Sequence, residues 1–383
     1  MKLDNNHQAF FALVKAGLWE QDVLLSQLGQ IDFNEIYRLA EEQSVVGLVA
    51  AGIEHVTDVK VPQNVALAFV GSTLQLEQRN LAMNDFLAKL IEQLRKKDIY
   101  SILVKGQGIA QCYERPLWRA SGDVDLLLSD VNYEKAKAIL LPLAVNSEQE
   151  YKVFKHLGMT MKEGFVVELH GTLHSRLSKR IDRGIDEAQN KVFYGGNVRS
   201  WQNGSTQISL PGVDDVVFLF THVLHHFYIE GIGLRQICDW CRFLWTYCNE
   251  LKDPLLEQRL HKMGIMSEWR AFAALAVDCL GMPEEAMPLY SSDKKWSKKA
   301  EYIMEFVLES GNFGHNRKTV NGKLSSAWNK MKDFVRHSRI FPMDSFKFFF
   351  HFVRNGIQVM TSNKYIINII SLSAPPKILW MWQ

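Results

Sequence analysis

Two aspartates stand one residue apart at the head of an apolar run, in the stretch SGDVDLLL that contains Asp123 and Asp125. Side chains alternate between the two faces of a β-strand, so these carboxylates are predicted to share one face while Val124 and Leu126 point into the core. Two like charges so close repel each other unless a cation lies between them. Hard cations such as Mg²⁺ prefer carboxylate and phosphate oxygens, so the pair indicates a metal that bridges a phosphate ligand. The alternative is a strand end whose aspartates merely face water.

Two further features favour the metal-bridged phosphate. The stretch LVKGQG, with Lys105, Gly106 and Gly108, has the pattern of a strand end, a glycine turn and a helix N-terminus, where backbone N–H groups can hold a phosphate. A third carboxylate, Glu168 in FVVELHG, lies on a second candidate strand and shares a face with His170. An isolated glutamate on an apolar strand is costly to bury without a partner. Together, the turn, the acid pair and the distant acid indicate metal-assisted phosphoryl or nucleotidyl transfer.

The elements that must position these residues follow from the apolar periodicity. Residues 1–96 carry apolar side chains at three- and four-residue steps with few breakers, which predicts a helical N-terminal region. Over 97–210, short apolar runs alternate with helical segments and end in the turn residues of NGSTQISLPG, which predicts a compact α/β or α+β core. The helical pattern returns over 211–383. The expected fold is therefore α+β, with a mixed sheet flanked by helical regions.

The bulk composition limits the classes of protein to consider. A chain of 383 residues suggests two or three domains, and a hydrophobic share of 47% is that of an ordinary folded protein. The net charge of +2 gives no global basic field for nucleic acid. Asp4 interrupts the apolar stretch that a signal peptide needs, and the five cysteines are an odd number, so we expect a cytoplasmic protein with reduced thiols. No apolar run reaches the roughly 18 residues of a membrane span, so integral membrane association is not expected.

The stretch ILVKGQGIAQCYERPLWRASGDVDLLL resembles the nucleotidyltransferase superfamily that includes DNA polymerase β. In that superfamily a glycine turn precedes Asp-hydrophobic-Asp, and a third acid follows on another strand. With VVELHGTLH and LFTHVLHHF downstream, the chain is more narrowly similar to a bacterial family of nucleotidyltransferase-like proteins, over about residues 100 to 245. The resemblance implies a nucleotidyltransferase-type mixed sheet and a helical C-terminal domain.

The resemblance also implies roles for individual residues. The catalytic acids and metal ligands would be Asp123, Asp125 and Glu168, which would bind two Mg²⁺ ions, or Mn²⁺ in their place. The nucleotide would be bound by Lys105, Gly106, Gln107, Gly108, Arg119 and Ser121. The acceptor pocket would be lined by His170, His222 and His226. The implied reaction moves a nucleoside monophosphate from a nucleoside triphosphate such as ATP to the hydroxyl of an unidentified small molecule, RNA or protein.

Two departures from the superfamily pattern keep alternatives open. Gln107 follows Gly106 where a small Ser or Gly typically stands, so a phosphate-binding hydroxyl is absent unless Ser121 supplies it. The gap from Gly106 to Asp123 is also longer than in the superfamily, although it suits the narrower family. One alternative is a glycosyltransferase whose Asp-x-Asp holds a metal and a sugar nucleotide. The other is a non-catalytic member that binds a nucleotide or a partner.

Two residue groups on the predicted C-terminal helices have simpler explanations. His222 and His226 fall on one helical face and are expected to be hydrogen-bonded core histidines, with a zinc site completed by Cys238 or Asp239 as the alternative. Arg235 and Asp239 are four residues apart, a spacing that predicts an exposed ion pair on a helix.

Overall fold

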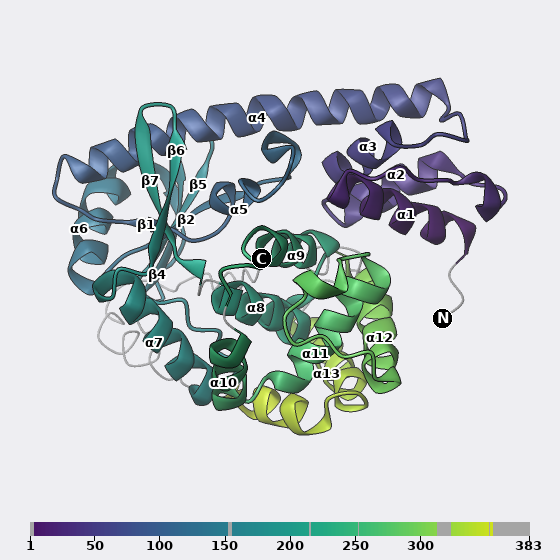
Figure 1. Cartoon of the computed structure of the whole chain (residues 1–383). Helices are drawn as coiled ribbons and strands as arrows, with labels where there is room; N and C mark the ends of the chain where they lie inside the picture. The colour runs from purple at the N-terminus through teal and green to yellow at the C-terminus, as the bar shows by residue number, and fades with distance from the viewer. Residues whose placement is uncertain are drawn as a thin grey trace.

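The computed structural model describes residues 4–151, 155–213, 216–251, 253–311, 323–351 and 353–354 (Figure 1). Residues 355–383, the end of the predicted helical region 211–383, lie outside the described residues. The described chain combines many helices with a small mixed sheet, which confirms the predicted α+β class. The division of the chain after residues 96 and 210 stays a prediction.

The first 95 residues form helices, in agreement with the apolar periodicity. In chain order these helices are α1 (Asn5–Trp19), α2 (Phe33–Glu42), α3 (Val46–Glu54) and α4 (Gln63–Arg95). Asp4 and Asp32 cap α1 and α2 by accepting hydrogen bonds from backbone N–H groups of the first turn. The 33-residue helix α4 runs across the top of Figure 1, from the N-terminal helices to the sheet, and so connects the two parts.

A five-stranded mixed sheet carries the acids. Its elements in chain order are β1 (Ile102–Leu103), α5 (Gln107–Ala110), β2 (Asp123–Leu127), α6 (Asp130–Leu140), β3 (Ala144–Ser147), β4 (His156–Met161) and β5 (Val166–His170). The strand order is β1-β2-β5-β4-β3; β2 and β5 are parallel and their other neighbours antiparallel. The apolar side chains of β2 and β5, including Val124, Leu126 and Val167, are buried in a core shared with α4 and α6. Because the apolar side chains of β2 and β5 face this core, the polar residues that alternate with them point to the opposite face of the sheet.

A hairpin of β6 (Val198–Asn203) and β7 (Thr206–Pro211) lies beyond the five-stranded sheet. The stretch NGSTQISLPG was expected to supply turn residues that close the core, and its second half, which was not predicted as a strand, also forms the strand β7. The reason is the alternation of Thr206, Ile208 and Leu210, which are buried, with more exposed polar neighbours. A Cβ atom added to Gly108 of α5 would lie 2.7 Å from a methyl carbon of Leu210, so α5 and β7 approach closely at this glycine.

The rest of the described chain is helical and builds the larger core. The helices are α7 (Lys179–Tyr194), α8 (Val216–His225), α9 (Leu234–Thr246), α10 (Asp253–Met263), α11 (Met266–Ala274), α12 (Lys294–Ser310) and α13 (Lys323–Ser338). A π-helical turn, η5 (His226–Glu230), continues α8 directly. The rings of Phe220, Trp240 and Trp269 pack together in the centre of this core. Among the described residues, no helix combines the length and apolar character needed to cross a membrane.

Candidate functional site

The three predicted acids lie together on two neighbouring strands. Because β2 and β5 are parallel and in register, Asp125 lies directly beside Glu168, and Asp123 lies one side-chain step earlier on the same face of β2. The negative charges of Glu168 and Asp125 also raise the pKa of the Asp123 carboxyl, as expected for neighbouring acids. The structure therefore brings Asp123, Asp125 and Glu168 together on one face of the inner strands β2 and β5.

Asp125 is the most buried of the three acids and has a lysine and a histidine as partners. It is only 5% exposed. Lys105 Nζ and His170 Nε2 each lie 2.9 Å from the same oxygen, Oδ1 of Asp125. Burial alone would raise the pKa of this carboxyl, but the positive charge of Lys105 and the hydrogen bond from His170 outweigh it and hold the pKa below its usual value. Asp125 is thus an ionised carboxylate whose negative charge is stabilised by contacts within the protein.

Glu168 has two histidine partners, one of which was not predicted. His156 Nε2 lies 3.2 Å and His170 Nε2 3.3 Å from Oε2 of Glu168. Although burial raises the pKa of the Glu168 carboxyl, its hydrogen bonds to the two histidines dominate and hold the pKa well below its usual value. His156 lies on β4 directly across from His170. The alternation in HLGMTM indicates a strand that begins at His156, but only the register of β4 against β5 places this histidine beside Glu168.

Asp123 differs from the other two acids in having no compensating contact. It is the exposed first residue of β2, and in the described part of the chain no donor lies within hydrogen-bonding distance of its carboxylate. Desolvation by the surrounding protein and the nearby charges of Glu168 and Asp125 raise the pKa of Asp123 to about 6. A carboxylate in this situation favours an added cation. The carboxylates of Asp123, Asp125 and Glu168 supply oxygen ligands of the kind that a hard divalent ion such as Mg²⁺ prefers.

The glycine turn lies against the strand of acids. The N–H of Val104 donates to the carbonyl of Asp125 at 3.1 Å, which extends the pairing of β1 with β2 up to the turn. Gly106 follows with φ +56° and ψ −119°, a conformation that favours glycine, and a Cβ atom there would lie 3.2 Å from the Asp123 carbonyl oxygen. The N–H of Gly108 donates to the Lys105 carbonyl and so closes the turn itself. The glycine turn thus positions the Lys105 side chain in contact with Asp125.

The side chains that were assigned to the nucleotide after the turn have partners within the protein. Gln107 is buried; its amide nitrogen donates to Oδ1 of Asn84 at 2.8 Å, and its amide oxygen accepts from the Ser121 hydroxyl at 2.8 Å. The Arg119 guanidinium donates to Ser121 Oγ at 3.0 Å and to both carboxylate oxygens of Asp239, at 2.8 and 2.6 Å. This buried chain of contacts ties the loop before Asp123 to α4 and α9. It occupies donors of Gln107, Ser121 and Arg119 that the resemblance assigned to the triphosphate.

The same network corrects one prediction for α9. Asp239 was expected to form an exposed ion pair with Arg235, yet Asp239 is 7% exposed and its Oδ1 also accepts a hydrogen bond from the Tyr113 hydroxyl at 2.8 Å. The Arg235 guanidinium donates to the carbonyl of Ala120 at 3.0 Å. The prediction was wrong because the i,i+4 rule considers only one helix, whereas α9 is buried against the loop that precedes β2.

The histidines of α8 and η5 form a polar group that lies near the acids. His226 Nε2 lies 3.1 Å from His222 Nε2, and His226 Nδ1 lies 2.8 Å from Oε2 of Glu230. Burial lowers the pKa of His222 well below its usual value, and the charge of Lys105 lowers it further. His222 is therefore a neutral imidazole, and its pKa responds to the charge of Lys105. The role of His170, His222 and His226 in an acceptor pocket stays a prediction.

Two further cations lie close to the acids and were not assigned a role from the sequence. Burial lowers the pKa of Arg176, while the carboxylates of Glu230 and Glu168 act in the opposite direction. Burial also lowers the pKa of Arg235, which the charge of Asp123 partly offsets. Their positions depend on contacts between distant segments, so no local pattern in the sequence indicates them.

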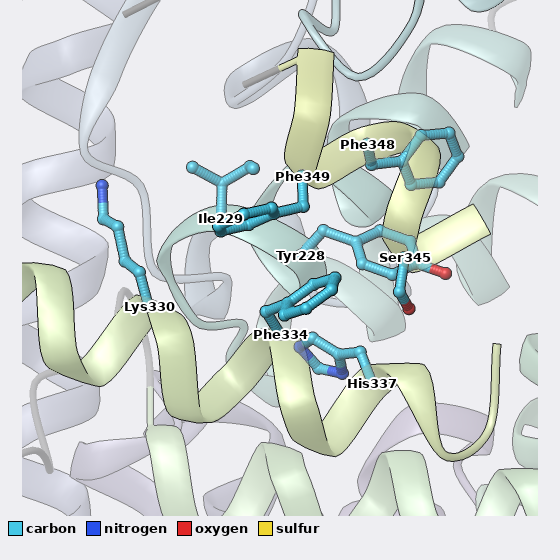
Figure 2. A pocket seen from close by; sticks show the side chains of 8 residues that line it. All are labelled: Tyr228, Ile229, Lys330, Phe334, His337, Ser345, Phe348 and Phe349. Carbon is cyan, nitrogen blue, oxygen red and sulfur yellow. The ribbon is translucent and has the colours of Figure 1, made fainter. Parts of the chain in front are cut away.

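A cavity lies apart from this group of acids, between η5 and α13 (Figure 2). Tyr228 and Ile229 approach it from η5, and Phe334 and His337 from α13, so its walls are mainly aromatic. The Tyr228 hydroxyl donates to Oε1 of Glu268 at 3.0 Å. None of the three acids lines this cavity.

The fold and the site define a class before any comparison is made. A mixed sheet that carries three acids on adjacent parallel strands, beside a glycine turn and a lysine, is equipped for phosphoryl or nucleotidyl transfer. A family model described as "uncharacterised nucleotidyltransferase" matches residues 29–281, and the chain belongs to that family. This confirms the resemblance to nucleotidyltransferase-like proteins and indicates a transferase with a nucleotide substrate. No curated protein and no solved structure matches the chain.

Proposed function

We propose that this protein is a Mg²⁺-dependent nucleotidyltransferase that moves a nucleoside monophosphate from a nucleoside triphosphate to the hydroxyl of an acceptor. The observation that carries the proposal is the register of β2 and β5, which aligns Asp125 with Glu168 and leaves Asp123 open beside them. Membership of the nucleotidyltransferase family supports the reaction class. In this reaction the acceptor hydroxyl loses its proton to water, its oxygen bonds to the α-phosphorus, the bond from the α-phosphorus to the bridging oxygen breaks, and pyrophosphate leaves.

The residues of the site would divide the work as follows. Asp123, Asp125 and Glu168 would hold Mg²⁺, which when bound supplies charge neutralisation for the phosphate oxygens. Lys105, anchored 2.9 Å from Asp125, would direct its positive charge toward the same phosphates. The pKa of Glu168 is held well below its usual value, which favours a ligand over a proton acceptor for this residue. Catalysis would then depend on positioning and charge.

A thermal-shift experiment with each of the four nucleoside triphosphates and Mg²⁺ tests the proposal. Binding of a ligand at about one hundred times its dissociation constant stabilises a fold by about 2.7 kcal/mol, so the correct donor should raise the melting temperature. The shift should require Mg²⁺ and vanish in the Asp123→Asn/Asp125→Asn variant, and pyrophosphate release should accompany it when the acceptor is present. A shift of equal size in the variant would exclude these acids as the metal site.

A second candidate, a non-catalytic nucleotide-binding protein, is favoured by one observation. Gln107 has no hydroxyl, its amide is bonded to Asn84 and Ser121, and the Ser121 hydroxyl donates to Gln107 instead of lying open to a phosphate. A Mg²⁺-dependent thermal shift without pyrophosphate release from any acceptor pool would support this candidate. No contact in the site favours the glycosyltransferase alternative, and family membership counts against it.

A further inference from the structure

We infer that His156, Glu168 and His170 form a binding site for a divalent transition metal of the zinc type, separate from the ion expected between Asp123 and Asp125. The inference concerns metal binding by the resting protein and does not rest on nucleotidyl transfer. It begins with the two histidines, because nothing in a site built to hold Mg²⁺ requires imidazole nitrogen.

The backbone places the three side chains together. His156 on β4 and His170 on β5 are direct partners in an antiparallel pair, and Glu168 lies two residues before His170 on the same face of β5. Ligand atoms of the three residues lie within 4.8 Å of one another. The two imidazole rings are 4.8 Å apart between centroids, and both turn Nε2 toward the same glutamate oxygen. Three of the four ligands that a zinc ion takes are thus presented by two strands, which are rigid elements.

The distances within the group fit a small ion with nitrogen ligands. The separations of Nε2 from the Glu168 oxygen are 3.2 Å for His156 and 3.3 Å for His170. A tetrahedral zinc ion with bonds of about 2.0 Å separates neighbouring ligand atoms by about 3.3 Å. Only the gap between the two imidazole nitrogens would need to narrow. The side chains of His156 and Glu168 are 19% and 24% exposed, so an ion can reach them from solvent.

The chemistry of the ligands selects the metal. Two imidazoles and a carboxylate, with a position left for water, are a known ligand set for zinc, whereas Mg²⁺ takes oxygen ligands and keeps most of its water. Oδ1 of Asp125 lies 2.9 Å from the same nitrogen, Nε2 of His170, so this contact would give way to the bond between that nitrogen and the ion. Glu168 would then be shared between an all-oxygen site on Asp123 and Asp125 and a nitrogen-containing site on the histidines.

Zinc titration of the full-length, untagged and chelator-treated protein tests the inference, with a chromophoric chelator as competitor. The wild type should bind one Zn²⁺ per chain, and a thousandfold excess of Mg²⁺ should not displace it. His156→Ala and His170→Ala should each lower the Zn²⁺ affinity at least about tenfold. His174→Ala is the matched control, because His174 is also half-buried and paired with a carboxylate, Asp186, but lies outside the group. Its Zn²⁺ affinity should equal that of the wild type.

The outcomes separate this site from the proposed reaction. Asp123→Asn should keep its Zn²⁺ affinity while it loses the Mg²⁺-dependent nucleotide shift, so the two proposals fail independently. Circular dichroism would verify folding, and His156→Gln would replace the alanine variant if the latter unfolds. Equal Zn²⁺ affinity in the wild type and a folded His156 variant would overturn the inference, as would sub-stoichiometric binding by the wild type. Co²⁺ absorption of the tetrahedral kind, lost in the His156 variant, would support it.

Discussion

The ion pair between Arg119 and Asp239 gives the sharpest prediction for the stability of this protein. Both residues are buried, at 8% and 7% exposure, and the guanidinium reaches both carboxylate oxygens at 2.8 and 2.6 Å. Arg119→Met would leave the Asp239 carboxylate buried, with the hydroxyl of Tyr113 as its remaining donor among the residues that the structure describes. Loss of one partner from a buried pair costs about 3–5 kcal/mol, because the remaining charge stays desolvated. We expect a loss of this size in the free energy of unfolding.

Two further variants show whether the loss in the free energy of unfolding arises from the ion pair between Arg119 and Asp239. Arg119→Lys keeps the charge but loses the two-pronged contact, and should cost about 1–3 kcal/mol. In Arg119→Met/Asp239→Asn no charge is left unpaired, so its cost should fall below the sum of the single variants by about 0.5–3 kcal/mol. Urea unfolding, followed by tryptophan fluorescence and circular dichroism, measures each change if the two signals coincide.

An exposed pair on α2 provides the control. Arg38 contacts Glu35 and Glu42 along one helix, and the Arg38 side chain is 51% exposed. Arg38→Met should therefore cost less than about 1 kcal/mol. If Arg119→Met were as mild as Arg38→Met, the buried pair would not hold the loop before Asp123 to α9, and the reasoning from burial would be refuted.

Two other predictions concern backbone strain and pH. Gly106→Ala should lower the free energy of unfolding by about 1–3 kcal/mol, because residue 106 has a positive φ and the added Cβ would press on the Asp123 carbonyl. Gly196 also has a positive φ, of +69°, but open space surrounds it. Gly196→Ala should therefore cost less in the same urea assay. Burial and the charge of Asp344 raise the pKa of Glu268 to about 8, so the folded state retains a proton that the unfolded state loses. The free energy of unfolding should then fall as pH rises from about 5 to about 8. Glu268→Gln should flatten this decline, and an unchanged slope in the variant would contradict the assignment.

The sequence predicted the elements whose pattern is local. The alternation in VDLLL and FVVELHG was enough to place Asp125 and Glu168 on strands, and the resemblance joined them in one site. The sequence did not predict that β1 comprises only two residues, because the chain turns at Gly106 as soon as Val104 has paired with β2. Nor did it predict β7, whose alternation is short and surrounded by turn residues.

Contacts between distant segments account for the residues that were missed. Arg119 and Asp239 are 120 positions apart, and no local rule connects them. His156 was overlooked because its importance comes from the register of β4 against β5, which a sequence pattern does not reveal. Sequence reasoning thus found the acids together with Lys105 and His170, and it missed His156, Arg176 and Arg235, which only the tertiary structure brings to them.

The basic side chains at the site explain how the sheet tolerates three acids on one face. Lys105 Nζ and His170 Nε2 lie beside Oδ1 of Asp125, and the two histidines lie beside Oε2 of Glu168, so both inner acids have partners within the protein. Asp123 has no such partner at hydrogen-bonding distance among the described residues, and it is also the exposed acid. An incoming cation therefore gains most at Asp123, on the solvent side, without first displacing Lys105. Under the proposed function, a metal and its phosphate ligand would enter together from this side while Lys105 stays in place on Asp125.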